Sequence, residues 1–188
     1  MTRTRIIGIA AAAALGLTAN AAFAQGGYGS LSAFDWEIER TTEEGDFPKL
    51  SSKGVRAIGG YMADANIGVE FHVASGGEDD FEFPVDETTT EDADAELNKL
   101  LSVFARASAP VNPWMNVYGL AGYSYALVEI LGETTATSQS ESGFSFGAGV
   151  ELSLVPERLY LTLDHVEYVS QHDVDINATS LGFRLAFQ

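Results

Sequence analysis

The sequence predicts an all-β fold, an eight-stranded antiparallel up-and-down β-barrel that spans a membrane. Eight segments after Gly27 alternate apolar residues with polar or small ones, which is the pattern of a strand with two different faces. No later segment offers the about 20 consecutive apolar residues of a spanning helix, so only a closed sheet could cross a bilayer. The last segment shows the alternation clearly, with Thr179, Leu181, Phe183, Leu185 and Phe187 between Ser180, Gly182, Arg184 and Ala186.

The start of the chain has the three parts of a secretory signal peptide. Arg3 and Arg5 form a positive start, an apolar run extends from Ile6 to Leu17, and Ala22-Phe-Ala24 places small residues at a cleavage position. A transmembrane anchor is the alternative, but the run is mostly alanine and is interrupted before the cleavage position. The expected domains are a cleaved signal peptide, residues 1–24, and an outer-membrane β-barrel domain, residues 25–188.

Composition excludes several classes of function. The chain carries a formal charge of −17, and cleavage would remove Arg3 and Arg5 but no acid, which lowers the charge to −19. We expect no nucleic-acid partner, because an acidic chain repels phosphates. The absence of cysteine excludes a lipoprotein anchor and a disulfide scaffold. No motif indicates a cofactor.

The strands and their connections follow from the period-2 pattern. Most segments reach the about 9–11 residues that a tilted strand needs to cross a bilayer. The expected strands are 29–39, 53–62, 66–75, 98–108, 115–128, 144–154, 159–168 and 178–187. The short connections are 62–66, 109–113 and 155–158, and the long polar ones are 40–52, 76–97, 129–143 and 170–177. Short turns at one end and long loops at the other are typical of outer-membrane barrels, with both termini on the periplasmic side.

A soluble sheet with one solvated face is the main alternative to a barrel. The polar face favours the barrel, because glycine and alanine on it suit a crowded lumen better than a solvated surface. Those small residues are Gly68, Ala74, Gly147, Gly149, Gly182 and Ala186. Three segments leave their facing open: 97–104, 115–128, and 159–168, where Val166 and Tyr168 break the phase and predict a bulge near His165 or an exit from the membrane.

Three stretches resemble the small eight-stranded outer-membrane barrels, the family that includes the OmpA-like membrane domain and the porin-family barrel domain. They are the paired strands Val55–Ala74, which contain Ile67-Gly-Val-Glu-Phe71, the stretch Tyr118-Gly-Leu-Ala-Gly-Tyr-Ser-Tyr125, and the closing Leu181-Gly-Phe-Arg-Leu-Ala-Phe187. The resemblance covers essentially the whole chain after the signal peptide. It implies that the barrel-assembly machinery recognises the last strand, through Phe183, Leu185 and Phe187.

Two sets of residues are candidates for structural roles in such a barrel. Charged residues on the polar face would form a buried lumen network, because an isolated ion there would be very costly. The expected lumen network is Glu37, Arg56, Glu70, His72, Arg106, Glu151, Asp164 and Arg184. Amphipathic rings near strand ends would anchor the barrel at the membrane interfaces. The expected interface aromatics are Trp36, Tyr61, Trp114, Tyr123 and Tyr125.

The loop from Gly76 to Glu96 is strongly acidic, and a solvated acidic loop is the simplest interpretation. Its ten acids are Glu78, Asp79, Asp80, Glu82, Asp86, Glu87, Glu91, Asp92, Asp94 and Glu96. The spacing of Asp92, Asp94 and Glu96 is similar to the start of a calcium loop, although the turn glycine and the distal glutamate are missing. We therefore assign no metal site, and keep these three as a candidate for weak binding of divalent cations.

The expected function is structural, in envelope integrity or in surface interaction, and not enzymatic. We expect a monomer in the outer membrane of a Gram-negative cell, in contact with the lipid bilayer and lipopolysaccharide. One alternative is a lipid A-modifying barrel enzyme, for which the only candidate cluster is Asp164, His165, Glu167, Ser170 and His172. The other alternative is a soluble periplasmic β-barrel that binds a ligand. We assign no catalytic residue.

The closing strand generates a first testable prediction. Changing Phe187 to Glu should impair insertion into the outer membrane, because it places a charge in the apolar series that the assembly machinery reads. Deleting Gln188, which follows that series, should leave insertion unchanged. Heat-modifiable migration in gel electrophoresis measures the inserted fraction of each variant. Equal insertion of both variants would contradict the assembly-signal interpretation.

Overall fold

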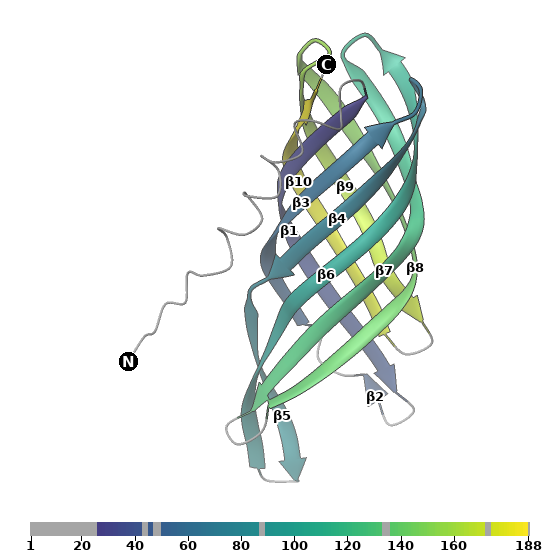
Figure 1. The fold of residues 1–188 in the computed structure, drawn as a ribbon. Coiled ribbons are helices and arrows are strands. Elements are labelled where there is room, and N and C mark those ends of the chain that lie inside the picture. Colours follow the sequence, from purple (N-terminus) through teal and green to yellow (C-terminus); the bar gives the residue numbers. More distant parts are fainter. Residues whose placement is uncertain are drawn as a thin grey trace.

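The computed structural model describes residues 26–42, 45–46, 50–86, 89–132, 136–171 and 174–187. Eight long strands form one closed antiparallel barrel (Figure 1), which confirms the predicted fold class. The barrel strands are β1 (Gly27–Thr42), β3 (Leu50–Met62), β4 (Ile67–Gly76), β6 (Thr89–Asn112), β7 (Met115–Gly132), β8 (Ala136–Val155), β9 (Leu159–Gln171) and β10 (Val174–Ala186). Two short strands, β2 (Gly45–Asp46) and β5 (Glu78–Asp86), extend this sheet at one end.

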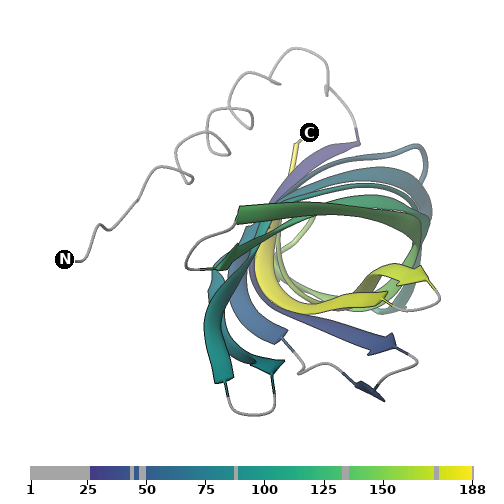
Figure 2. The ribbon, with the colours of Figure 1, turned by 90° about the horizontal axis from the view of Figure 1, so that it is seen from below.

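Pairing between the first and last strands closes the barrel. Strand β1 pairs with β10 from Tyr28 opposite Ala186 to Arg40 opposite Val174, and it pairs with β3 on its other edge. Each remaining barrel strand pairs with two neighbours, so the sheet closes into the ring that is seen along its axis in Figure 2. Within the described residues, no helix is long and apolar enough to cross a membrane.

At one end the connections are the short turns that the sequence predicts. At the other end, most of the residues predicted as long loops at 129–143 and 170–177 belong to strands. There β7 pairs with β8 as far as Leu131 opposite Ala136, and β9 pairs with β10 as far as Gln171 opposite Val174.

Short turns occupy 63–66, 113–114 and 156–158, at the same end as Gly27 and Phe187 (top of Figure 1). Asp64 closes the first turn, where its Oδ1 accepts hydrogen bonds from the backbone N–H groups of Asn66 at 2.7 Å and Ile67 at 2.8 Å. These bonds, the first above all, lower the pKa of Asp64 below its usual value. We refer to this end as the short-turn end and to the opposite one as the hairpin end.

At the hairpin end the structure corrects the prediction of a long loop between residues 76 and 97. Strand β5 pairs with the first part of β6, from Glu78 opposite Glu96 to Asp86 opposite Thr89. On its other edge β6 continues to pair with β7 as far as Ala93 opposite Gly132. The sheet therefore extends past the barrel, because a ladder that is already formed continues at little entropic cost.

The structure also assigns the faces that the alternation left open. Val166 and Tyr168 both lie inside the barrel, so β9 needs no bulge at His165. The register shift lies further along, opposite the step from Ile176 to Asn177. A second shift between Leu97 and Lys99 turns the following part of β6, so that Leu97 and Leu100 both face inward.

The face assignment of β1 is the reverse of the prediction. Trp36 is fully buried inside the barrel, and Phe34 and Ile38 lie inside with it, whereas Glu37 is on the outer face and half-buried. Trp36 is therefore not an interface anchor, and Glu37 is not part of the lumen network. The physical reason is that the lumen near the hairpin end is filled with apolar side chains, including Leu97, Phe104, Val128, Val166, Val169 and Ile176.

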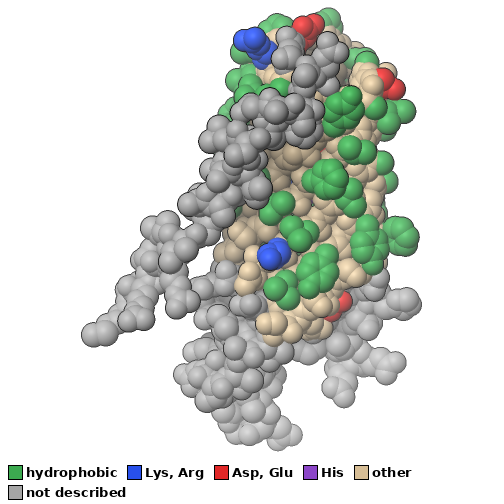
Figure 3. All heavy atoms as spheres, in the orientation of Figure 1, with side chains coloured by type: hydrophobic (Ala, Val, Ile, Leu, Met, Phe, Trp, Pro, Cys, Tyr) green, Lys and Arg blue, Asp and Glu red, His purple; other side chains and the backbone are tan. Residues whose placement is uncertain are grey.

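The outer surface carries apolar side chains along the middle of the strands. On β4 the pattern is strict, with Ile67, Val69, Phe71 and Val73 exposed and the intervening residues buried. Hydrophobic side chains are spread over the barrel face in Figure 3, and the few described acidic side chains there lie near the two ends. An outer surface that is apolar around a partly polar interior is the reverse of a water-soluble protein and is typical of a membrane barrel.

Two neighbouring glycines of β3 test the packing of the lumen. A Cβ on Gly60, which faces inward, would come within 2.1 Å of the Tyr28 ring, whereas a Cβ on Gly59, which faces outward, would meet nothing within 4 Å. The Tyr28 ring cannot easily move, because its hydroxyl donates to Glu70. Gly60→Ala should lower the free energy of unfolding by about 1–3 kcal/mol, as overpacking does. Gly59→Ala should change it by less than about 0.5 kcal/mol.

Reversible urea unfolding in lipid vesicles measures both values. Equal free energies of unfolding for Gly60→Ala and Gly59→Ala would contradict the close packing of the Tyr28 ring against Gly60 of β3.

Candidate functional site: the polar network of the barrel lumen

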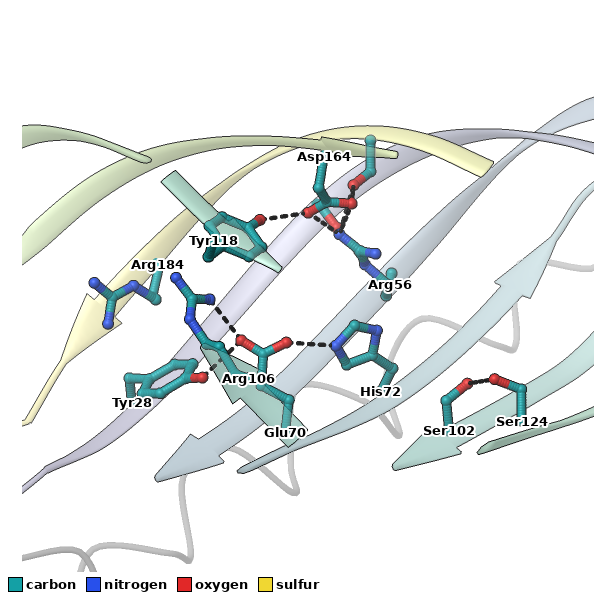
Figure 4. Close-up of polar contacts among 12 residues, drawn as sticks. Tyr28, Arg56, Glu70, His72, Ser102, Arg106, Tyr118, Ser124, Asp164 and Arg184 are labelled. Carbon is teal, nitrogen blue, oxygen red and sulfur yellow. Dashed lines mark hydrogen bonds and ion pairs between the residues drawn. The ribbon is translucent and has the colours of Figure 1, made fainter. Parts of the chain in front are cut away.

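Glu70 is the centre of a buried network in the half of the lumen near the short-turn end (Figure 4). Its Oε1 accepts from the Arg106 guanidinium and from the Tyr28 hydroxyl, both at 2.6 Å. Its Oε2 lies 2.8 Å from His72 Nε2. The alternation of β4 brings Glu70 and His72 to the same inner face, two residues apart. One carboxylate thus joins β1, β4 and β6.

Glu151 continues the network toward the short-turn end. Its Oε1 lies 2.5 Å from Arg106 Nη2 and 2.8 Å from Arg184 Nε, so this carboxylate joins two guanidinium groups from β6 and β10. The Arg106 guanidinium lies over the Tyr118 ring, 3.8 Å from its centroid. Arg184 lies over Tyr160 at 4.2 Å. These aromatic faces stabilise the two cations.

Arg56 and Asp164 form the other half of the network. Arg56 Nη2 lies 2.7 Å from Asp164 Oδ2, and Nη1 donates to the Tyr168 hydroxyl at 2.8 Å. The Tyr118 hydroxyl donates to the same Asp164 oxygen at 2.9 Å. His72 Nδ1 lies 3.4 Å from the Tyr168 oxygen, which links the Arg56 half to the Glu70 half. The whole network is continuous from Arg184 to Asp164.

The formal charges of the network cancel. Among the described residues, the buried ionic groups of the lumen are Arg56, Arg106, Arg184, Glu70, Glu151 and Asp164, three of each sign. The contacts of His72 fit a neutral ring, in which Nε2–H donates to Glu70 and Nδ1 accepts from Tyr168. A balanced and hydrogen-bonded set is the condition under which charges tolerate burial. Such a set stabilises the barrel and fills its interior.

A pocket opens at the short-turn end of the network. Its volume is about 380 Å³, and its wall includes Arg106, Glu151, Tyr160, Arg184 and Asn116. Beyond Arg56 and Asp164 the lumen passes to buried serines, where Ser124 donates to Ser102 at 2.7 Å, and then to the apolar cluster. The pocket is therefore closed on its inner side by ionic and then by apolar side chains.

The structure brings together seven of the eight residues expected in the lumen, all except Glu37. Sequence reasoning missed three tyrosines, Tyr28, Tyr118 and Tyr168, whose hydroxyls bond to the ionic groups. The inward positions of Tyr118 and Tyr168 were visible as breaks in the apolar alternation. A tyrosine at a polar-face position was the signal, since a buried hydroxyl needs a partner.

The expected interface aromatics other than Trp36 lie on the outside. Tyr61 and Trp114 are exposed at the short-turn end, and Tyr123 and Tyr125 are exposed on the part of β7 toward the hairpin end. Tyr123 packs edge-on against Phe144 at 5.8 Å between ring centroids. These positions form two groups of rings separated along the strands.

The remaining candidate residues have different environments. Phe183 and Leu185 are exposed on the outer face of β10, and the backbone N–H of Phe187 donates to the Gly27 carbonyl at 2.8 Å. Asp92, Asp94 and Glu96 lie on β6, but their side chains are outside the described residues. Elsewhere in the described chain, no group of three or more acidic or histidine side chains is arranged to hold a metal ion.

The cluster considered for catalysis is divided by the barrel wall. Asp164 is buried in the lumen, whereas His165 is exposed outside and contacts Thr179 Oγ1 at 2.9 Å through Nδ1. Ser170 is exposed and His172 lies outside the described residues. Because Asp164 cannot orient His165 from the opposite face, the arrangement does not favour an enzyme of this kind.

Comparison with known proteins agrees with the fold. The family model for the outer membrane protein beta-barrel domain matches residues 7–187. No curated protein sequence matches the chain. Among solved structures, Ail from Yersinia pestis is 19% identical with a TM-score of 0.57, covering 86% of this chain and 100% of Ail. Neisserial surface protein A is 15% identical with a TM-score of 0.60, covering 87% and 98%. OprG from Pseudomonas aeruginosa is 11% identical with a TM-score of 0.58, covering 85% and 95%.

The ion pair between Arg56 and Asp164 generates a prediction about stability. Arg56→Met and Asp164→Asn should each destabilise the barrel by about 3–5 kcal/mol, because each leaves an uncompensated buried charge. The double variant should lose much less than the sum of the two. Urea unfolding of the three variants in lipid vesicles measures this coupling. Effects that add to within about 0.5 kcal/mol would contradict a direct pair.

Proposed function

Because the chain belongs to the outer membrane protein β-barrel domain family, we propose that it is a closed, non-catalytic barrel that supports the envelope and displays an acidic hairpin at the cell surface. The observation that carries the proposal is the filled lumen. An ionic network occupies one half and an apolar cluster the other, so the described side chains leave no polar path along the axis. Transport of solutes through the barrel is therefore disfavoured, and the outer surface and the hairpin are left as the functional parts.

The proposed orientation places the short-turn end in the periplasm. Short periplasmic turns and longer extracellular extensions are the rule for outer-membrane barrels. The hairpin end, with β5 and the adjoining part of β6, would then project outside the cell. Residues 1–24, which are outside the described residues, would act as the cleaved signal peptide that exports the chain.

The proposed partners follow from this placement. The apolar outer surface would contact the lipid bilayer and, in its outer leaflet, lipopolysaccharide. The barrel-assembly machinery would read Phe183, Leu185 and Phe187 during insertion. We propose a monomer, since the barrel closes on itself without a second chain. The hairpin acids, among them Asp92, Asp94 and Glu96, remain a candidate for weak divalent-cation binding outside the cell.

Conductance and surface labelling test the proposal together. The purified barrel should add no single-channel conductance to a planar bilayer, because the lumen is filled. An epitope inserted between Asp86 and Thr89, at the tip of the β5–β6 hairpin, should bind antibody on intact cells. The matched control is the same epitope inserted after Ala65 in a short turn, which should bind only after the outer membrane is permeabilised.

Discrete conductance steps would overturn the closed-lumen part of the proposal. Antibody binding to the Ala65 insertion on intact cells would overturn the orientation.

A further inference from the structure

The pocket at the short-turn end has polar groups in its wall that the ionic network does not use. Its volume of about 380 Å³ lies within the about 300–1,000 Å³ of small-molecule sites. Strand β7 contributes Asn116 to the wall and β9 contributes Tyr160, and both residues are half-buried. Neither the Asn116 amide nor the Tyr160 hydroxyl has a hydrogen-bond partner in the described part of the chain. Both groups are therefore available to a molecule that enters the pocket.

Arg184 supplies the pocket with a guanidinium group that is already held in place. Its Nε and Nη2 lie 2.8 Å and 3.0 Å from the two carboxylate oxygens of Glu151. The same cation lies over the rings of Tyr28 and Tyr160, 4.8 Å and 4.2 Å from their centroids. A group held in this way loses little further freedom when a ligand binds.

One nitrogen of this guanidinium is left over. Among the described residues, none accepts a hydrogen bond from Arg184 Nη1, because Glu151 occupies the edge formed by Nε and Nη2. Figure 4 shows the Arg184 guanidinium turned away from Arg106, at the margin of the network. Hydrogen bonds from a guanidinium to a carboxylate are charge-assisted and among the strongest in proteins. The inner part of the pocket therefore suits a carboxylate.

The rim of the same pocket carries the opposite charge. Asp64 lines the pocket from the turn between β3 and β4, where it is exposed. Its Oδ1 accepts the two backbone hydrogen bonds that close the turn, which leaves Oδ2 without a partner among the described residues. Because these bonds lower the pKa of Asp64, its carboxyl group is ionised at neutral pH. The rim therefore suits a cation.

The charges of the wall disfavour a ligand that has a charge of one sign only. The wall contains two arginines, Arg106 and Arg184, and two acids, Asp64 and Glu151, so its formal charge is zero. A simple anion would be attracted by Arg184 but repelled by Asp64, and a simple cation would meet the reverse. A ligand that carries both charges would gain from both groups.

We propose that this pocket binds a small zwitterion, such as an amino acid or a short peptide, with its carboxylate on Arg184 and its ammonium group beside Asp64. Asn116 and Tyr160 would bond to the polar atoms between the two charges. Because the lumen is filled further in, the ligand would be held and not passed through. This inference goes beyond the proposed function, adds a ligand site to the surface roles given there, and does not depend on the orientation of the barrel in the membrane.

A matched set of ligands tests the proposal on the unaltered barrel. Diglycine carries both charges, N-acetylglycine is diglycine without the ammonium group, and glycylglycinamide has an amide in place of the carboxylate. Each is titrated into the barrel in phosphatidylcholine nanodiscs and followed by NMR. The backbone amide resonances of Asn66 and Ser108 report on the pocket, and that of Lys99, toward the other end of β6, is the control.

We expect diglycine to bind at least about tenfold more tightly than glycylglycinamide, because the latter loses a charge-assisted hydrogen bond. Diglycine should bind about two- to fivefold more tightly than N-acetylglycine, because an ion pair with an exposed carboxylate is weaker. Glycine and triglycine extend the set to shorter and longer separations of the two charges. Failure of all three zwitterions to shift Asn66 and Ser108 would overturn the proposal. Equal binding of diglycine and N-acetylglycine would overturn the assignment of a zwitterion.

A pair of variants locates the ammonium group. Asp64→Asn keeps an oxygen for the two hydrogen bonds of the turn and removes the charge, so the preference for diglycine over N-acetylglycine should disappear. Asp175→Asn removes an exposed acid near the start of β10, at the hairpin end, and should leave this preference unchanged. Equal loss of the preference in both variants would overturn the role of Asp64.

Arg184→Lys tests the other end of the ligand. Lysine keeps a cation beside Glu151 but lacks the Nη1 donors, so the preference for diglycine over glycylglycinamide should fall several-fold. Heat-modifiable migration identifies the folded fraction of the variant. An unchanged preference in the folded variant would overturn the assignment of the carboxylate to Arg184. If the variant does not fold, the ligand set on the unaltered barrel still decides the proposal.

Discussion

The need to pair every backbone N–H and C=O group within the hydrocarbon layer determines the rest of this structure. A sheet meets this requirement only by closing, and the ladder between β1 and β10 is the closure. Closure of eight strands leaves an interior just wide enough for side chains, so the inward face cannot stay empty or wet along its whole length. The small residues on that face, such as Gly60 and Gly182, are a consequence of this limited width, since larger side chains there would collide with Tyr28 and Ser32.

Charged side chains in the narrow interior are stable only if their charges are compensated. Buried ions must be balanced and hydrogen-bonded, and here three arginines meet three acids, with tyrosine hydroxyls and His72 completing the contacts. Toward the hairpin end the same space is filled without charge, by Trp36, Leu97 and Phe104 among others. The narrow interior is thus filled by paired charges in one half and by apolar side chains in the other. Among the described side chains, neither half leaves a conduit along the axis, which is the packing of a structural core.

The sequence predicted the number of strands, their order and the end at which the turns are short, because these depend on local periodicity and turn residues. It did not predict the inward face of β1. Alternation separates two faces, but it identifies the inner one only where the lumen is polar, and Phe34, Trp36 and Ile38 belong to its apolar half. The sequence also did not predict β5, since a run of acids has low strand propensity. The pairing of β5 follows from β6, which continues beyond the barrel as a strand and offers an edge to β5. Seven lumen residues were anticipated from their charge, whereas the tyrosine partners depend on contacts between strands distant in sequence.

Strand β6 gives the molecule a mechanical property. It is one strand of 24 residues from Thr89 to Asn112, with register shifts against β7 at Leu97–Lys99 and Pro110–Asn112, and a strand of that length spans roughly 80 Å. Any load applied to β5 therefore reaches the barrel wall along one continuous chain. That load acts parallel to the ladders of β6 with β4 and β7, so it is resisted by many hydrogen bonds in shear and not by a few in succession. In the proposed orientation, a load on the hairpin outside the cell would therefore be transmitted to the full length of the barrel wall along β6.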